Sequence, residues 1–391
     1  MVINMNKKTI LIFIFLFIIS LVLQSCNSGA DIEDLDFVAD CEYDTTLTVS
    51  ELCSLQETVT VAFIGGSITH SDAYRSYVME YLINAYPDNE FVEVRAGIGG
   101  TTSAFGVGRI DKHVIEYDPD IVFIEFSVND GSDDDLYKES MEGMIRKVLG
   151  NKENTLLTVI GTATAVTMPS YKNGEDPAGV RGHKEVAAYY NVPYINVGKV
   201  LYQHIVDTET DVLEYLPDNV HPNYVGGKIY ADEIIRWLQD YEWNIDFKEQ
   251  PLTANSYENA YMHWASEFAN DQWTVSLGGG NIYDDHLVPN YIESKGVGST
   301  LEFDFYGTFF GAFYTLEDDS GIIEYSIDGG EWQKFSLWDI YCLDSDRCGG
   351  SIIVNGLENK EHHMVIRVSA EKDDRSNGNK VNFSAFYWGH K

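Results

Sequence analysis

Residues 61–70 read Val-Ala-Phe-Ile-Gly-Gly-Ser-Ile-Thr-His, an apolar run that stops at two glycines and a serine. A continuous apolar run of this kind is typical of a buried parallel strand. Gly65 and Gly66 permit a tight turn that would bring the hydroxyl of Ser67 to the carboxyl edge of the sheet. Alone, the stretch also fits an ordinary turn after a strand. Residues far downstream in the sequence decide between these two interpretations.

From Thr58 to about Asp240, short β-branched runs alternate with longer helical patterns. The predicted strands are Thr60–Ile64, Phe91–Val94, Ile121–Phe126, Leu156–Ile160 and Tyr194–Val197. The predicted helices are Tyr74–Ala85, Ala104–Glu116, Leu136–Leu149, Val180–Tyr190 and Tyr224–Leu238. Such alternation predicts a three-layer α/β/α domain with a parallel sheet. Ligands of such sheets lie outside the carboxyl ends of the strands, where Ser67 and the loop after Phe126 would emerge.

After about Trp243 the helical patterns fade, and short alternating runs appear between Gly, Asn and Asp turns. Four of these runs are predicted strands: Leu301–Phe305, Ile322–Ile327, Met364–Val368 and Phe383–Trp388. This half of the chain is therefore predicted to be an all-β domain, a sandwich or a jelly roll. Its tryptophans, which include Trp273, Trp332, Trp338 and Trp388, could stack on sugars, but most are expected to fill the core.

The amino terminus is predicted to be a targeting segment. Lys7 and Lys8 precede an apolar run at 10–23, which is short for a membrane span and has the length of a signal-peptide core. The run ends in Leu-Gln-Ser-Cys, which resembles a bacterial lipobox and implies cleavage before Cys26 and lipid attachment to its thiol. The alternatives are an uncleaved anchor and an ordinary secretory signal. Residues 27–36 are polar and acidic, which is typical of a tether.

Four cysteines remain if Cys26 carries a lipid. In an oxidising compartment they could pair locally, Cys41 with Cys53 and Cys342 with Cys348. Four cysteines allow three connectivities, and free buried thiols are a further alternative.

The composition excludes one class of partner. The 391 residues include 26 Lys and Arg against 62 Asp and Glu, a net charge of −36. A phosphate backbone would be repelled, so nucleic acid is not expected as a partner. The acidity is better explained by the solubility of a secreted surface. The length favours two domains.

Four short motifs follow predicted strands or precede the last predicted helix. They are Gly65-Gly66-Ser67, Ala96-Gly97-Ile98-Gly99-Gly100-Thr101-Thr102, Glu125-Phe126-Ser127-Val128-Asn129-Asp130-Gly131 and Asp218-Asn219-Val220-His221-Pro222. The second lacks both the lysine of a P-loop and the spacing of a dinucleotide-binding loop. In the fourth, an Asp three residues before a His can orient the imidazole from one short loop.

In this order and spacing the four motifs resemble the sequence blocks of the SGNH (GDSL-type) hydrolase family, and the match spans residues 58–240. The resemblance implies a flavodoxin-like sheet and a serine esterase. It also implies that Ser67 attacks an ester carbonyl, that His221 takes its proton, and that Asp218 orients the imidazole. The oxyanion would be bound by the backbone N–H groups of Ser67 and Gly100 and by the amide of Asn129. No metal or cofactor is implied.

Some residues depart from the family pattern or allow other roles. Gly66 stands where the family's name-giving motif has Asp, and Arg95 stands where the second block usually has Asn. Arg95 and Arg109 could face substrate, but a structural pairing with a surface carboxylate is favoured. A helix cap accounts for Asp130. His70 has no carboxylate placed to orient it, so it is not expected to be the base.

The motifs divide the chain into a signal peptide (1–25), an acidic tether and lead-in segment (26–57), a hydrolase domain (58–245) and a β accessory domain (246–391). A lipid anchor would place the protein at a bacterial outer membrane or cell surface, or facing the periplasm. Relatives with this layout imply an acylated, mainly acetylated, extracellular glycan as substrate. The alternatives are a lipase, phospholipase or thioesterase, and a glycan-binding lipoprotein without catalysis. The sequence leaves the oligomeric state open.

Overall fold

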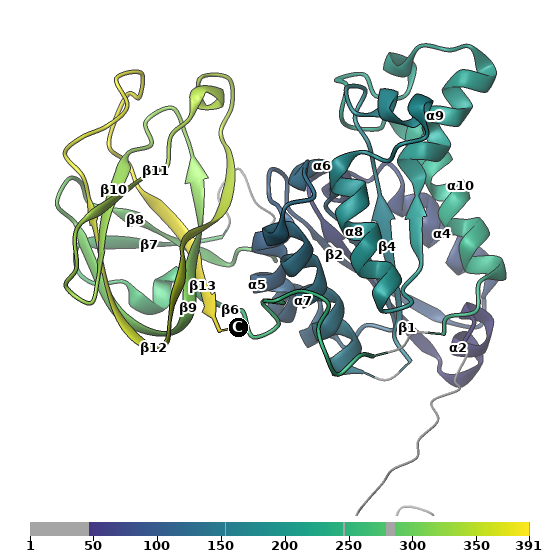
Figure 1. Ribbon diagram of the computed structural model, residues 1–391, viewed down its shortest axis with the longest axis horizontal. Coiled ribbons are helices and arrows are strands. Elements are labelled where there is room, and N and C mark those ends of the chain that lie inside the picture. Colours follow the sequence, from purple (N-terminus) through teal and green to yellow (C-terminus); the bar gives the residue numbers. More distant parts are fainter. Residues whose placement is uncertain (1–46, 153, 245–246, 279–285, 391) are drawn as a thin grey trace, which may run out of the picture. The chain divides into compact units, whose positions relative to one another are not determined.

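The computed structural model describes residues 47–152, 154–244, 247–278 and 286–390 (Figure 1). These described residues form one compact unit, which contains two sheets. The predicted signal peptide, Cys26 and Cys41 lie outside the described residues. Within the described ranges, no helix has the length and the apolar character that crossing a membrane requires.

The first sheet is parallel and has five strands in the order β2-β1-β3-β4-β5, which is the flavodoxin-like order. Its strands are β1 Thr58–Gly65, β2 Glu90–Gly97, β3 Ile121–Glu125, β4 Leu156–Gly161 and β5 Tyr194–Asn196. The predicted parallel α/β domain is therefore confirmed. The sheet places the carboxyl ends of β1, β2 and β3 side by side, because β1 pairs with both of the others.

Helices cover both faces of this sheet, so the domain has the three predicted layers (Figure 1). The helices are α2 Val49–Leu55, α3 Ser67–His70, α4 Arg75–Ala85, α5 Ser103–His113, α6 Ser127–Asp130, α7 Asp135–Asn151, α8 Ala178–Tyr189, α9 Val197–Thr208 and α10 Tyr224–Asp240. Short 3-10 turns lie at Ile115–Tyr117, Met168–Asn173 and Val212–Glu214. Apolar residues of α5, α7 and α8 build one core, and those of α2, α4, α9 and α10 build the other.

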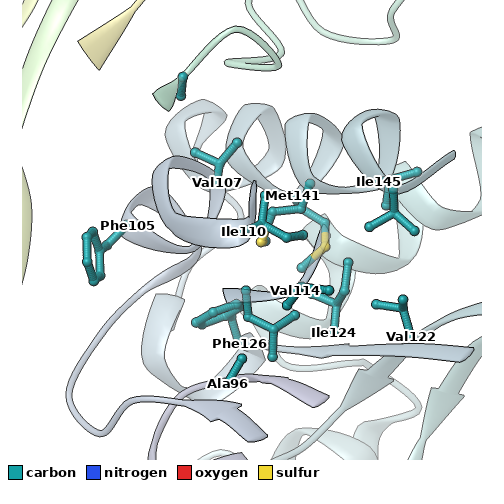
Figure 2. Packing of buried hydrophobic residues seen from close by; sticks show 14 of the residues in the cluster. Ala96, Phe105, Val107, Ile110, Val114, Val122, Ile124, Phe126, Met141 and Ile145 are labelled. Carbon is teal, nitrogen blue, oxygen red and sulfur yellow. The ribbon is translucent and has the colours of Figure 1, made fainter. Parts of the chain in front are cut away.

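The central strands are apolar throughout because each face of the sheet has its own core. Val122 and Ile124 belong to the core under α5 and α7, which Figure 2 shows. Ile121 and Phe123, which alternate with them, belong to the core under α4 and α10. This period of two explains why β3 has no polar position before Glu125.

The second sheet is antiparallel and curls into a half-barrel, in the path β11-β10-β12-β9-β13-β8-β7, with β6 paired to β13 (Figure 1). Its strands are β6 Tyr261–Trp264, β7 Trp273–Leu277, β8 Asn290–Ser294, β9 Thr300–Leu316, β10 Ile322–Ile327, β11 Gln333–Ser336, β12 Arg347–Val368 and β13 Asn382–Gly389, with 3-10 turns at Ala265–Phe268 and Ile340–Leu343. Asp328 and Gly329 have positive φ angles of 53° and 70°, as the turn between β10 and β11 requires. The all-β prediction is confirmed.

Most of the tryptophans of the second sheet fill its core, as expected. Trp273 and Trp338 are buried, and Trp388 packs against the same cluster. Trp332 differs, because 44% of it is exposed and the Arg367 guanidinium lies over its ring.

Helix α5 joins the first sheet to the second through a shared core. The ring of Phe105 stacks on that of Phe313, with centroids 4.4 Å apart, and also contacts Tyr387. A Cβ at Gly350 would come within 2.7 Å of the Phe105 ring, so only glycine lets β12 approach this closely. The start of α5 is thus packed against β9, β12 and β13.

The predicted disulfide between Cys342 and Cys348 is not formed in the structure, where both thiols are buried. The reason is that they point into different cores. Cys342 lies in the core of the second sheet, whereas Cys348 lies in the core shared with α5. Cys53 is also a free buried thiol, and its predicted partner Cys41 lies outside the described residues.

Candidate active site

Ser67 lies at the carboxyl end of β1, as predicted, and is the first residue of the short helix α3. The backbone turns at Gly66, whose N–H donates to the carbonyl oxygen of Glu125 on β3 at 3.3 Å. A Cβ at Gly66 would overlap the side-chain amide of Asn129. Glycine is therefore required at position 66, where the family motif has Asp, because the Asn129 amide occupies the space.

His221 and Asp218 complete a chain of hydrogen bonds that starts at Ser67. The imidazole Nε2 of His221 lies 2.6 Å from Ser67 Oγ, and its Nδ1 lies 2.6 Å from Asp218 Oδ2. Asp218 Oδ1 accepts from the backbone N–H groups of His221 and Val220 at 2.7 Å and 2.9 Å. The Asp218 carboxylate thus fixes both the backbone of the loop 218–221 and the imidazole ring of His221. A hydroxyl, an imidazole and a carboxylate in this order can pass a proton away from the hydroxyl.

The Asp218 carboxyl is held in its charged form. Partial burial acts to raise its pKa, but the hydrogen bonds from the backbone and ring of His221 and from Val220 outweigh it and lower the pKa to about 2. Asp218 therefore stays a carboxylate across the physiological range. Such a group keeps the proton of His221 on Nδ1 and leaves Nε2 to accept from Ser67.

The second and third motifs lie against the Ser67 turn. A Cβ at Gly99 would come 3.5 Å from Ser67 Cβ, so this loop packs on the serine itself. Gly100 has a φ of +73°, a conformation that favours glycine. Asn129 lies on α6, directly after β3, and its buried Oδ1 has no hydrogen-bond partner among the described residues. The structure therefore brings Ser67, Gly99, Gly100 and Asn129 to one edge of the sheet.

Arg109 is fully buried beneath this edge. Its guanidinium donates to the carbonyl oxygens of Gly65 and Ala96 at 3.1 Å and 2.7 Å, so it ties together the ends of β1 and β2. Burial lowers its pKa to about 9, although Cys348 acts in the opposite direction. The sequence had favoured a surface carboxylate as its partner. Backbone carbonyls take that place, because Arg109 lies on the buried side of α5 instead of facing solvent.

Glu125 is a site residue that sequence reasoning missed. It ends the apolar strand β3, is fully buried, and accepts hydrogen bonds from Thr162 Oγ1 at 2.6 Å and Thr69 Oγ1 at 3.2 Å. Burial raises the pKa of Glu125 to about 7, against the effect of these two hydrogen bonds. Thr69 belongs to α3, so Glu125 anchors the helix that carries Ser67. An acidic residue at the end of an apolar strand was the available signal.

Glu125→Gln is expected to remove a pH-dependent loss of stability. Burial raises the pKa of Glu125 from 4.5 to about 7 in the folded state. The contribution of the protonated Glu125 side chain to the free energy of unfolding is therefore fully present below about pH 4.5 and is lost as the pH rises through about 7. Glutamine cannot ionise, so its advantage over the wild type should grow by roughly 2 to 3 kcal/mol between about pH 5 and about pH 8. Urea unfolding at both pH values measures this difference. The exposed Glu57→Gln is the control, and equal behaviour of both variants would contradict the expectation.

The other candidate residues take peripheral positions. His70 Nδ1 lies 3.2 Å from the carbonyl oxygen of Gly97, and His70 is exposed at the end of α3. The backbone carbonyl of Arg95 lies 2.9 Å from His286 Nε2. Asp130 is buried and binds the start of α5 and a histidine of α8. In the described part of the chain, no three His, Cys, Asp or Glu residues lie close enough together to hold a metal ion.

Residues 63–229 match the model of the GDSL-like Lipase/Acylhydrolase family. The chain is also similar to the crystal structure of a two-domain esterase active on acetylated mannans, co-crystallised with mannopentaose. The two are 24% identical, the TM-score is 0.73, and the match covers 88% of this chain and 94% of that one. This likeness shows that both sheets share the fold of that protein.

A second solved structure matches about half of the chain. It is a catalytic mutant of an acetylxylan esterase from Geobacillus stearothermophilus, 19% identical, with a TM-score of 0.40, and the match covers 47% of this chain and 95% of that one. Among curated protein sequences, none is similar enough to count as a match.

Proposed function

We propose that the protein is a carboxylic ester hydrolase that removes O-acetyl groups from an extracellular polysaccharide or oligosaccharide. The match of residues 63–229 to the model of the GDSL-like lipase/acylhydrolase family supports this proposal. The observation that carries the proposal is the continuous hydrogen-bonded chain from Ser67 through His221 to Asp218. A hydroxyl in this setting is a nucleophile for acyl groups.

In the proposed mechanism Ser67 Oγ attacks the ester carbonyl while His221 Nε2 takes its proton. The protonated imidazole then gives this proton to the leaving sugar oxygen, which departs as a hydroxyl, and Ser67 carries the acetyl group. Water attacks this acyl-enzyme while His221 takes its proton. The imidazolium returns the proton to Ser67 Oγ as the acyl bond breaks and acetate leaves. Asp218 stabilises the imidazolium in both steps, which its low pKa allows.

We propose that the oxyanion formed in each step is bound by the backbone N–H groups of Ser67 and Gly100 and by the side-chain amide of Asn129. The packing of Gly99 on Ser67 and the close approach of Asn129 to Gly66 support this assignment. If the amide nitrogen of Asn129 faces the oxyanion, its oxygen points toward Gly66, which agrees with the buried Oδ1 found there.

The acetylated glycan is the substrate class that the comparisons favour. The two-domain esterase active on acetylated mannans matches 88% of this chain with a TM-score of 0.73. We also propose that Cys26 carries a lipid that anchors the enzyme at the cell surface or outer membrane, with the periplasmic side as the alternative. Labelling with a radioactive fatty acid, in the wild type and in Cys26→Ala, would test the anchor.

The test of the proposed function is acetate release from a panel of acetylated polysaccharides, measured beside hydrolysis of matched acetate and octanoate esters. We expect acetate release from at least one polymer and a preference for the acetate ester. A preference for octanoate would overturn the acetyl-esterase proposal in favour of a lipase or thioesterase. No hydrolysis of any ester, in a folded protein, would favour a glycan-binding role without catalysis.

A further inference from the structure

The helix that carries Asn129 is held at both ends. Helix α6 has only four residues, Ser127–Asp130, so its own backbone hydrogen bonds cannot fix it in place. At its start, Ser127 Oγ lies 3.2 Å from Thr162 Oγ1 and accepts from the Thr162 backbone N–H at 2.8 Å. This contact fastens α6 to the end of β4. The other end is fastened by Asp130.

Asp130 contacts two different elements through its two carboxylate oxygens. Oδ1 accepts from the backbone N–H of Ser103, the first residue of α5, at 2.9 Å. The side chain of Thr102, which precedes α5, makes no capping hydrogen bond, so Asp130 takes over that function from another helix. A carboxylate is favourable at this position, because the N-terminus of a helix carries partial positive charge.

The second oxygen of Asp130 binds a buried histidine. His183 Nε2 of α8 lies 2.7 Å from Oδ2, and both side chains are fully buried. A carboxylate can only accept, so Nε2 carries the proton. Gly179 lets α8 come this close, because a Cβ there would overlap the carbonyl oxygen of Ser127. Burying such a pair is costly and adds little stability by itself.

The position of Asp130 in the chain gives a reason for burying the pair of Asp130 and His183. Asn129 is its neighbour in the chain, and Ser103 follows directly on the loop that contains Gly99 and Gly100. One carboxylate therefore holds both the helix of the Asn129 amide and the loop of the Gly100 N–H. The distance between these two proposed oxyanion donors depends on the contacts that Asp130 makes.

We propose that Asp130 is a positioning residue that fixes the Asn129 and Gly100 donors relative to each other, and that His183 orients its carboxylate. This inference rests on the proposed esterase function, because it assigns a role to the oxyanion site. Neither side chain touches the substrate. Their effect on the reaction passes through Asn129 and Gly100.

The test is the kinetics of Asp130→Asn, alone and combined with Asn129→Ala. Misplacement of preorganised donors costs rate in the transition state, so kcat should fall at least about tenfold with KM nearly unchanged. In the Asn129→Ala background, Asp130→Asn should lower kcat by a clearly smaller factor, because one of the two donors that Asp130 positions is already absent. If Asp130 acted on stability alone, Asp130→Asn would lower kcat by the same factor in the wild type and in Asn129→Ala. That result, or an unchanged kcat, would overturn the proposal.

Asp133→Asn is the matched control. Asp133 also binds α8, through Arg181 at 3.0 Å, but both side chains are about half exposed and neither reaches the site. Its kcat should equal that of the wild type. If Asp130→Asn does not fold, His183→Ala and His183→Gln replace it. Glutamine keeps an N–H donor and should restore at least part of the kcat that alanine loses. Equal kcat for both variants would also overturn the proposal.

The rate at which a fluorophosphonate probe labels Ser67 separates this inference from the proposed function. The phosphoryl oxygen of the probe needs the same oxyanion donors, but no glycan is involved. If the wild type is not labelled, the proposed serine chemistry fails. If the wild type is labelled and Asp130→Asn is labelled at the same rate, only the positioning role fails. We expect labelling of the variant to be slower by at least about tenfold.

Discussion

Replacing Ser67 by alanine is expected to abolish acetate release while the protein stays folded. The proposed reaction has no other nucleophile, because His221 Nε2 contacts only Ser67 Oγ among the described residues. Loss of a nucleophile of this kind typically lowers kcat by roughly 10⁴-fold or more. The fold should persist, because Ser67 is only partly buried and, within the described ranges, its side chain hydrogen-bonds to His221 alone. Acetate release and thermal unfolding, measured on the same preparation, test both parts.

Ser71→Ala is the matched control for this experiment. Ser71 follows the same short helix, and its hydroxyl donates to the carbonyl oxygen of Ile68 at 2.9 Å. The control should keep the activity of the wild type. Retention of activity by Ser67→Ala would rule out the proposed nucleophile. If the wild type is not labelled by a fluorophosphonate probe, the serine is not activated, and the binding role without catalysis becomes the better explanation.

Asn129→Ala is expected to lower kcat about a hundredfold or more and to change KM little. The amide would act only on the charge that develops in the transition state, so its loss should raise the barrier by about 3 kcal/mol without weakening the binding of the ground state. Steady-state kinetics with a soluble acetate ester measure this split.

A second substitution at the same position separates the loss of a donor from the loss of volume. Asn129→Asp has nearly the same shape but has no N–H donor when ionised, so it should be at least as slow as Asn129→Ala. An unchanged kcat in the alanine variant would remove Asn129 from the mechanism. An aspartate variant as fast as the wild type would show that shape, and not hydrogen bonding, matters here.

The fold was largely predictable where one pattern dominated the local sequence. The strand at Ile322–Ile327 was predicted to the residue, and the five parallel strands were placed within three residues at each end. Helix α9, Val197–Thr208, was missed. Its first residue, Val197, is β-branched and follows β5 directly, so the pattern resembled the end of a strand. Asn196, whose side chain caps α9 by accepting from the Lys199 N–H, was the signal that could have revealed it.

The candidate site was predictable where the chemistry is carried by short motifs. Ser67, Asn129 and His221 were named from their position after strands or before a helix, and the structure brings them to one edge of the sheet. Glu125 and the pair of Asp130 with His183 could not be found in this way. Asp130 and His183 are 53 residues apart, and their contact depends on how closely α8 packs on α6. The state of Cys342 and Cys348 likewise depends on which core each thiol enters.

The stacking of Phe105 on Phe313 has a consequence for separating the two halves of the chain. The helix that begins at the Gly99–Gly100 loop has its first turn buried under strands that come more than 200 residues later in the chain. Without the second half, the Phe105 ring would lose this cover and be exposed to water next to the loop that carries Gly99 and Gly100. The two halves therefore cannot be separated without exposing apolar surface.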